Sequence, residues 1–503
     1  MLLLAPTALR LLPTSGGGGG EGRTAPRPSL LVRIHGELYD LAAFEHPGGH
    51  EVLRRTAGTK GGDITHLFYS NHREPRVSAL RHFRIAESAP LVDAGEQPTS
   101  EPHSALYREL KSEVYAHLEA RGVEWRHTFR WEPYAHRLVC LACAHAAVVH
   151  AAGDGSSYTA IGVGSAAAYG LLTGRMTWTH AHNGVHNPSA LPPAMRALMA
   201  VDFVGVVEAW MAEHHAHHAH TNGARDPDAS WFRPLFDYRD VAAGGGSLRV
   251  TALAAAAYPF LVPVMLVKSL AHARASDPDG ASTLAWVIAV APLRFAIDFA
   301  ILGPVGFAAA LTVATAYICG TFVATHQAPH NHEPTTGDWA IDQMRSTNDV
   351  WPECRLWSMV TGGISHHTEH HLFPNFSSEA LPEVATVVTK FASRHGLPRH
   401  TFSPAGLLSE HAALLSGAGA AGHGPAQPPA HSPARAMVRD SKRGPARAEC
   451  ASEPGDPSGC PVTSAKDALA RLRGGSGGVR QAARAGNFTH ILSALDHTAL
   501  VPG

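Results

Sequence analysis

Two consecutive stretches near the middle of the chain carry almost no charge. They are Leu138–Ala152 and Ser156–Gly174, separated by the segment GDGS. A bilayer offers no water to hydrogen-bond backbone groups, so an apolar run of this length is stable in lipid only as a helix. The pair therefore predicts a hairpin of two short membrane-spanning helices.

Other apolar runs extend this pattern. Val250–Val267 and Phe299–Thr325 predict a third and a fourth crossing. Leu284–Leu293 is too short to span alone and leads into charged residues, so we expect it at the membrane interface or inside protein. Charged residues also argue against a full crossing by Pro192–Met211. Only 17% of all residues are charged, below the quarter usual in soluble proteins, and an integral membrane protein is therefore expected.

Histidine is the unusual component of the composition. The chain has 35 histidines and a formal net charge of -1. The balanced charge argues against nucleic acid as a partner. Imidazole is the commonest metal ligand among side chains, so the excess of histidine predicts metal binding wherever its spacing is regular.

Near the N-terminus, two histidines have the spacing of a haem site. His46 begins the motif HPGG, and His72 follows the segment DITHLFYSN. Two histidines that close both axial positions of a haem iron leave no place for oxygen, which makes such a site an electron carrier. His66 is a competitor for the second position. Residues 30–86 resemble a cytochrome b5 domain, with His46 and His72 at the positions of the axial ligands of haem b.

Three further motifs place histidines at metal-ligand spacing. One is H-x-x-x-H, which would put both rings on one face of a helix, and two are H-x-x-H-H. Their histidines are His182 and His186, then His214, His217 and His218, then His367, His370 and His371. Motifs one and two lie between the second and third predicted crossings and motif three follows the last, so all three face the same side of the membrane.

This many imidazoles exceed the four ligands that one zinc ion accepts, so two metal ions are implied. Imidazole suits iron, zinc and copper, and ligand type alone does not separate them. An electron-carrying haem in the same chain favours a redox-active metal, because zinc has no use for delivered electrons.

The motifs, together with the order of the two sites, resemble the membrane fatty acid desaturases and, among them, front-end acyl desaturases with an N-terminal cytochrome b5 domain. The resemblance covers residues 30–86 and 104–405 and includes the segments TNGARDPD, DWAIDQMRSTND, EHHLFP and HGLPRH. It implies a di-iron centre ligated by the eight histidines of the three motifs. We expect His326 as a ninth ligand, with His330 and His332 as rivals.

Two positions depart from the front-end pattern. Asn183 stands where the family usually has Asp, and His367 stands where front-end enzymes usually have Gln. The second departure leaves the position of the double bond open. Several neighbours of the motifs are expected to support the ligands or to lie at the surface; they are His180, His215, His220, His366, Glu213 and Glu369.

The predicted fold class is mainly α, with a small α+β haem domain before a multi-helix transmembrane di-iron domain. The predicted parts are a low-complexity leader (1–28), a cytochrome b5-like haem-binding domain (29–86), a linker (87–103), a membrane desaturase domain (104–412) and a disordered tail (413–503).

The resemblance implies an oxidoreductase that uses O2 as co-substrate to insert a double bond into a fatty acyl chain carried by lipid or CoA. Electrons would come from an NAD(P)H-dependent cytochrome b5 reductase or a similar donor. The expected location is the endoplasmic reticulum with the sites facing the cytosol, or a chloroplast membrane if the leader is a transit peptide. Two alternatives stay open: an acyl or sphingolipid hydroxylase on the same scaffold, and a non-enzymatic membrane protein that binds haem and metal.

Overall fold

A computed structural model describes the chain in several ranges. They are residues 29–46, 53, 63–85, 103–126, 160–186, 207–261 and 280–418, with isolated positions at 139, 142, 145 and 146. The predicted leader, nearly all of the predicted linker and first crossing, and the chain beyond residue 418 lie outside the described residues.

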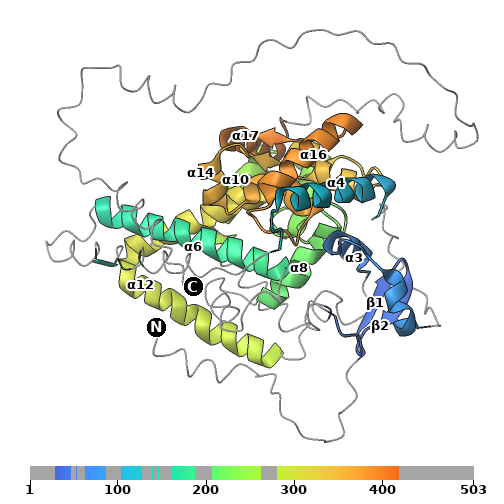
Figure 1. Cartoon of the computed structure of the whole chain (residues 1–503). Coiled ribbons are helices and arrows are strands. Elements are labelled where there is room, and N and C mark those ends of the chain that lie inside the picture. The colour runs from blue at the N-terminus through green and yellow to red at the C-terminus, as the bar shows by residue number, and fades with distance from the viewer. Residues whose placement is uncertain are drawn as a thin grey trace, which may run out of the picture. The chain divides into compact units, whose positions relative to one another are not determined.

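Helices dominate the described residues (Figure 1), which confirms the prediction of a mainly helical protein. The longer helices are α3 (Thr65–Asn71), α4 (Ala105–Arg121), α6 (Ala160–His186), α8 (Val207–Ala219), α10 (Leu248–Ala257), α12 (Gly280–Ile318), α13 (Trp339–Ser346), α14 (Arg355–Thr361), α15 (His367–Leu372), α16 (Leu381–His395) and α17 (Pro404–Ser416).

The N-terminal segment begins with a β-hairpin. Strands β1 (Leu31–Ile34) and β2 (Glu37–Asp40) pair antiparallel, with Leu31 opposite Asp40. The two residues between them, His35 and Gly36, have φ of 53° and 77°, the left-handed conformation that matches the twist of a two-residue hairpin. A small core forms between the hairpin, α3 and the 3-10 helix η1 (Val77–Phe83).

Helix α4 begins and ends where its sequence predicts. The Ser104 side chain accepts a hydrogen bond from the backbone N–H of Tyr107 at 3.1 Å, and Gly122 ends the helix with φ of 64°. Its apolar face packs against α16 in a common core that includes Leu110, Val114 and Val388.

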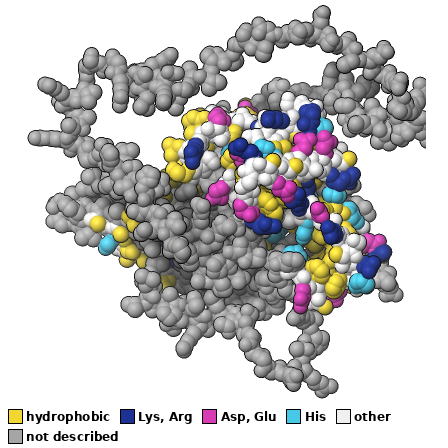
Figure 2. Space-filling model, viewed as in Figure 1, with side chains coloured by type: hydrophobic (Ala, Val, Ile, Leu, Met, Phe, Trp, Pro, Cys, Tyr) yellow, Lys and Arg dark blue, Asp and Glu magenta, His cyan; other side chains and the backbone are white. Residues whose placement is uncertain are grey.

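The exposed faces of α4 and α16 carry charge of both signs, as Figure 2 shows over this part of the molecule. Arg121 and Glu383 lie 3.3 Å apart, and Arg394 lies 3.6 Å from Glu109. Such exposed pairs contribute roughly 0–1 kcal/mol each, so the buried apolar face holds the two helices together.

Helix α6 lies beside the part of α12 that follows Gly303 (Figure 1). The two backbones approach closely at Gly170, where an added Cβ would lie 2.1 Å from the carbonyl oxygen of Ala310. Only glycine fits at such a contact, because any side chain would push the backbones apart. Helix α6 continues past Gly174, where the apolar run ends, and so carries the first histidine motif.

Helix α12 contains the run Leu284–Leu293 and most of the fourth predicted crossing, with a kink at Gly303, whose φ is 66°. The expected position of the run at the membrane interface or inside protein stays a prediction. The charges that follow the run neutralise each other, since Arg294 Nε and Asp298 Oδ2 lie 2.9 Å apart. The Tyr169 hydroxyl of α6 donates to Asp298 at 3.0 Å, so the charged pair is also part of the α6–α12 contact.

Within the described ranges, one helical stretch is long and apolar enough to cross a membrane by length and composition, Pro292–Val323, with a mean hydropathy of 1.8. The third predicted crossing is described only to residue 261, as helix α10 followed by a 3-10 turn, Tyr258–Phe260. The number of crossings therefore stays a prediction.

Among the described residues, α17 is the last helix. It continues to Ser416 and thus past residue 412, where the predicted domain ends, because Leu414 and Leu415 are buried in the main core. The His411 ring of this helix makes two hydrogen bonds. Its Nε2 atom lies 2.6 Å from the Tyr258 hydroxyl, and its Nδ1 atom lies 2.7 Å from the carbonyl oxygen of Gln327. Strands β3 (Asp349–Val350) and β4 (Thr401–Phe402) add a short parallel pair before it.

Candidate metal centre

The three histidine motifs lie on three helices that meet in the interior. His182 and His186 stand one turn apart at the end of α6, the second motif lies on α8, and the third lies on α15. The chain reaches His326 through a π-helical turn, Cys319–Val323, that follows α12. The nine predicted ligands are all buried: His182, His186, His214, His217, His218, His326, His367, His370 and His371.

Five of these rings form one group. They are His182, His186, His214, His218 and His370, and one ring nitrogen from each lies within 4.8 Å of the others. The Nε2 atom of His214 lies 2.9 Å from that of His186 and 3.1 Å from that of His218. The Nε2 atom of His370 lies 3.2 Å from that of His218.

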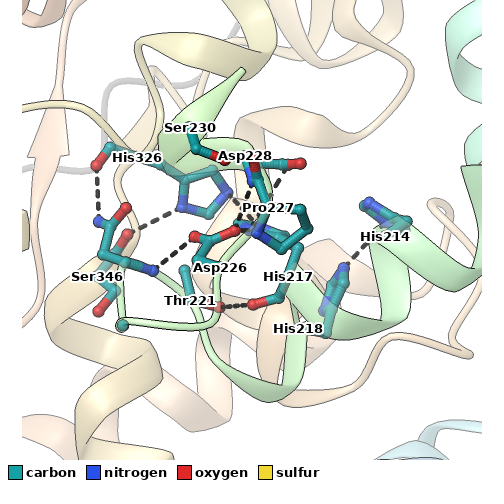
Figure 3. Close-up of polar contacts among 12 residues, drawn as sticks. His214, His217, His218, Thr221, Asp226, Pro227, Asp228, Ser230, His326 and Ser346 are labelled. Atoms are coloured by element: carbon teal, nitrogen blue, oxygen red, sulfur yellow. Dashed lines mark hydrogen bonds and ion pairs between the residues drawn. The ribbon is translucent and has the colours of Figure 1, made fainter. Parts of the chain in front are cut away.

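A second group lies beside the first. His217, His326 and His371 bring ring nitrogens within the same mutual distance. The Nε2 atom of His326 lies 3.3 Å from that of His217 and 2.6 Å from that of His367. Eight of the nine predicted ligands thus lie in two adjoining groups, and the ninth, His367, contacts the second group through His326. Figure 3 shows His217 and His326 from the second group and His214 and His218 from the first.

The donor set fits two metal ions. Nitrogen–metal bonds of about 2.1 Å place neighbouring ligand nitrogens roughly 3 Å apart, which is the spacing found in the first group. His371 Nε2 is buried without a hydrogen-bond partner. Burial, with repulsion from neighbouring imidazoles, holds the pKa of His218 and His370 well below the ordinary value. These rings are therefore neutral and able to bind a cation.

In the second group, the far side of each ring is held by an oxygen acceptor. His217 Nδ1 lies 2.9 Å from an Asp226 oxygen and 3.5 Å from an Asp228 oxygen, and Figure 3 shows both carboxylates at this ring. His326 Nδ1 donates to the carbonyl oxygen of Ser346 at 2.9 Å, and His371 Nδ1 to Gln343 Oε1 at 2.8 Å. Such acceptors fix the ring orientation and direct Nε2 toward the shared centre.

Asp226 and Asp228 also set the charge preference of the second group. Burial disfavours a charged His217, but the two carboxylates outweigh burial and raise the pKa of His217 to about 9. An environment that stabilises a cationic ring also stabilises a ring bound to a metal cation. The segment TNGARDPD contributes to the family resemblance, but its aspartates were not predicted as partners of a ligand.

The neighbouring histidines point elsewhere. His215 Nε2 contacts the carbonyl oxygen of Val185 at 3.0 Å. The two rivals of His326 have other partners: His330 Nε2 lies 2.7 Å from Asn348 Oδ1, and His332 Nε2 lies 2.9 Å from Gln327 Oε1. His326 is the histidine of this segment whose ring nitrogen lies near those of His217 and His367, and its role as the ninth ligand stays a prediction.

Glu369 lies between two predicted ligand histidines in sequence, and its carboxylate pairs with an arginine. Its carboxylate accepts from Arg399 at 2.8 Å, and Arg399 also donates to Asp349 at 2.8 Å. The predicted role of Glu369 as a hydrogen-bond partner of a ligand stays a prediction. Because Asp349 also accepts from the backbone N–H of Thr368 at 2.9 Å, this buried group holds the third motif in place.

The candidate haem ligands His46 and His72 also face each other. Their ring centroids lie 5.8 Å apart, and two imidazole–metal bonds of about 2 Å each fit between rings at this distance. His72 Nδ1 donates to the carbonyl oxygen of Phe68 at 2.7 Å, which leaves Nε2 for a metal. The competitor His66 lies apart, with its ring 5.8 Å from that of His220.

His66 and His220 line a polar cavity of about 310 Å³ next to the second group. Thr221 and Gln343 form its inner wall, where the Thr221 hydroxyl donates to Gln343 Oε1 at 3.0 Å. Because Gln343 also contacts His371, the cavity is separated from the predicted ligands by a single layer of side chains.

Comparison with known proteins identifies the chain's relatives. Residues 157–403 match the family model described as fatty acid desaturase. The chain is 23% identical over 413 residues to acyl-lipid (8-3)-desaturase of Mortierella alpina, covering 73% of this chain and 89% of the relative. It is 26% identical over 406 residues to the chloroplastic acyl-lipid (7-3)-desaturase of Chlamydomonas reinhardtii, covering 72% and 75%. It is 23% identical over 409 residues to Delta(5) fatty acid desaturase A of Dictyostelium discoideum, covering 73% and 86%. The matched residues include all nine predicted metal ligands, and over this range the chain is similar to the fatty acid desaturases.

Proposed function

We propose that this chain uses O2 to introduce a double bond into the fatty acyl chain of a membrane lipid. The observation that carries the proposal is that nine buried histidines from three helices and one connecting segment meet, eight of them in two adjoining groups and His367 in contact with His326. Relatives named acyl-lipid desaturases favour an acyl lipid over acyl-CoA as the carrier.

The substrate explains why a metal pair is needed. An unactivated acyl C–H bond has no acidic proton and no leaving group, so acid–base side chains cannot break it. Two irons, when bound, supply the redox chemistry that O2 activation requires. The protein's part is to hold the two ions side by side with imidazole ligands and to keep water away from them, and the burial of all nine rings excludes that water.

Outer residues complete the proposed centre. Asp226, Gln343 and the Ser346 carbonyl each hold a ligand ring by its Nδ1 atom. These contacts fix the orientation of each ring, so its Nε2 atom is already directed toward the metal. Motif one has Asn183 where the family usually has Asp. In this proposal, Asp226 in the segment after motif two supplies a carboxylate to the centre instead.

We also propose that His46 and His72 hold haem b and that this haem supplies the electrons. The geometry of the two rings supports a metal between them, and two axial imidazoles restrict a haem to electron transfer. An NAD(P)H-dependent reductase would reduce it. The fused arrangement keeps the donor at a high effective concentration near the iron site.

The membrane in question is proposed to be that of the endoplasmic reticulum, with a chloroplast membrane as the alternative that one relative's name includes. Fluorescence microscopy of the full chain with a C-terminal fluorescent protein distinguishes the two locations.

Expression in a host of known lipid composition tests the function. We expect new double bonds, located by mass spectrometry of the fatty acids, from the wild-type chain. His370→Ala removes a ligand of the first group and should abolish the product while the haem spectrum persists. His46→Ala should remove that spectrum.

Two other results would contradict the proposal. A hydroxylated fatty acid in place of an alkene would identify a hydroxylase. Product formation by the His370→Ala chain would show that the ligand assignment is wrong.

A further inference from the structure

Helix α4 lies between the segment that bears His72 and the segment that bears the third histidine motif. Tyr107, Lys111, Tyr115 and Glu119 recur every fourth residue and therefore lie on one stripe of the helix. Residues of this stripe contact the His72 segment, the His371 segment or both. Tyr107 and Tyr115 also belong to the core that α4 shares with α16, and Lys111 and Glu119 add polar contacts to the stripe.

Lys111 makes the central contact. Its ammonium group donates to the carbonyl oxygen of Tyr69 at 2.9 Å and to the carbonyl oxygen of His72. Both carbonyls belong to the end of α3, where the helix leaves its last C=O groups without partners and where its dipole favours a cation. The side chain of Lys111 is buried, at 4% exposure, so these bonds replace the water that the ammonium has lost.

Other residues hold the same end of α3. Asn375, which follows the third motif, donates its side-chain amide to the carbonyl oxygen of Asn71 at 2.9 Å. His103, just before α4, stacks on Tyr69 with ring centroids 4.4 Å apart. Arg73 pairs with Glu119 and lies 4.7 Å from the centre of the Tyr115 ring. The turn that contains His72 is thus held at several consecutive residues.

The same stripe reaches the third motif. The Tyr107 hydroxyl donates to the carbonyl oxygen of Leu372 at 2.5 Å, and Leu372 directly follows His371. The Lys111 ammonium lies 5.4 Å from the centre of the Tyr107 ring. One turn of α4 therefore connects the residue proposed to ligate haem with a residue proposed to ligate iron.

We propose that α4 is the docking element for the haem domain and that Lys111 is its positioning residue, which holds the His72 turn against the third histidine motif so that electrons pass between the sites of one chain. This inference rests on the proposed function. Each turnover would need two electrons, which leave the haem one at a time for the iron pair and are replaced by the NAD(P)H-dependent reductase.

Lys111→Met tests the proposal in the full-length, haem-loaded and iron-loaded protein. Methionine keeps the apolar stem and removes the donor, so the docking equilibrium should weaken by roughly tenfold or more, the scale of a lost hydrogen bond to a charged group. We expect faster hydrogen–deuterium exchange in peptides covering residues 65–85. We also expect slower reoxidation of the reduced haem when substrate and O2 are added.

Matched controls separate docking from general damage. Lys390→Met makes the same chemical change at an exposed site on α16 and should leave both measurements unchanged. Exchange in α16, residues 381–395, should also stay unchanged in Lys111→Met, because a general disruption of α4 would alter it. Lys111→Arg keeps a donor and should restore most of the haem reoxidation rate.

Asn375→Ala provides a second variant in case Lys111→Met does not fold. It removes one contact to the same turn from a partly exposed side chain and should shift both measurements in the same direction. Unchanged exchange and unchanged reoxidation in both variants would overturn the proposal. A wild-type chain that forms no double bonds would contradict the proposed function instead, and the exchange result would still test the docking contact.

Discussion

At the scale of single residues, His217 is held by a carboxylate from a different turn of the chain. Asp226 lies 2.9 Å from its Nδ1 atom because the turn after α8 folds back onto that helix. Regular spacing predicts His182 and His186 as neighbours, since only a helix brings the fourth residue back to the same face. Asp226 belongs to a loop, and no periodicity in the sequence relates it to His217.

Asp226 gives a prediction at this scale. Asp226→Asn removes the carboxylate that orients His217, and loss of such a partner weakens metal affinity or activity by about 10–100-fold. We expect lower iron content per chain and less product, with an unchanged haem spectrum. Metal analysis of the purified protein measures the first effect and lipid analysis the second.

Asp240→Asn is the matched control, because Asp240 is an exposed carboxylate of the same region. It should retain wild-type iron content. Equal iron content in the Asp226→Asn and Asp240→Asn chains would show that the contact to His217 has no part in metal binding.

At the scale of elements, helices were predictable where their ends carry local signals. Helix α4 begins after Ser104 and ends at Gly122, as the capping preferences of these two residues predict. The start of α12 was not predictable in this way, because a charge in an apolar run argues against a membrane helix until its partner is known. Arg294 and Asp298 are such partners, one turn apart on the same helix.

The contact between α6 and α12 gives an element-scale prediction. Gly170→Ala places a methyl group where it would lie 2.1 Å from a backbone oxygen of α12, and overpacking of this kind costs about 1–3 kcal/mol. We expect a lower melting temperature in detergent and less product, since α6 also carries His182 and His186.

Gly164→Ala is the comparison on the same helix, because an added Cβ there meets nothing within 4 Å. Alanine favours helix by about 1 kcal/mol over glycine, so this variant should be at least as stable as wild type. A similar loss of stability in both variants would mean that helix propensity, not the α12 contact, sets the effect.

At the scale of the whole molecule, the metal site is also a structural centre. The nine histidines extend from residue 182 to residue 371 and belong to elements distant in sequence. Buried neutral rings with unsatisfied nitrogens cost free energy in the absence of a cation, and metal that binds the folded state alone shifts the folding equilibrium toward it. The convergence was predictable from the order of motifs and crossings, whereas the docking of the His72 turn on α4 was not, because hydrogen bonds to backbone carbonyls leave no pattern in sequence.

Metal removal tests this coupling. A ferrous-iron chelator should abolish activity and lower the melting temperature while the haem spectrum persists, and added Fe²⁺ should reverse both effects. A ligand present at 100 times its Kd stabilises by about 2.7 kcal/mol. Zn²⁺ should restore the melting temperature without activity, since it binds imidazole but carries no electrons. If neither Fe²⁺ nor Zn²⁺ changed the melting temperature, the structural role of the centre would be contradicted.

Helix α17 limits how far the chain can be shortened. The family similarity ends at residue 403, one residue before α17 begins. A truncation at that limit would strip away Leu414 and Leu415 and deprive the Tyr258 hydroxyl and the Gln327 carbonyl of their contacts with His411. Trimmed versions for crystallography or cryo-electron microscopy should therefore retain the chain through residue 418.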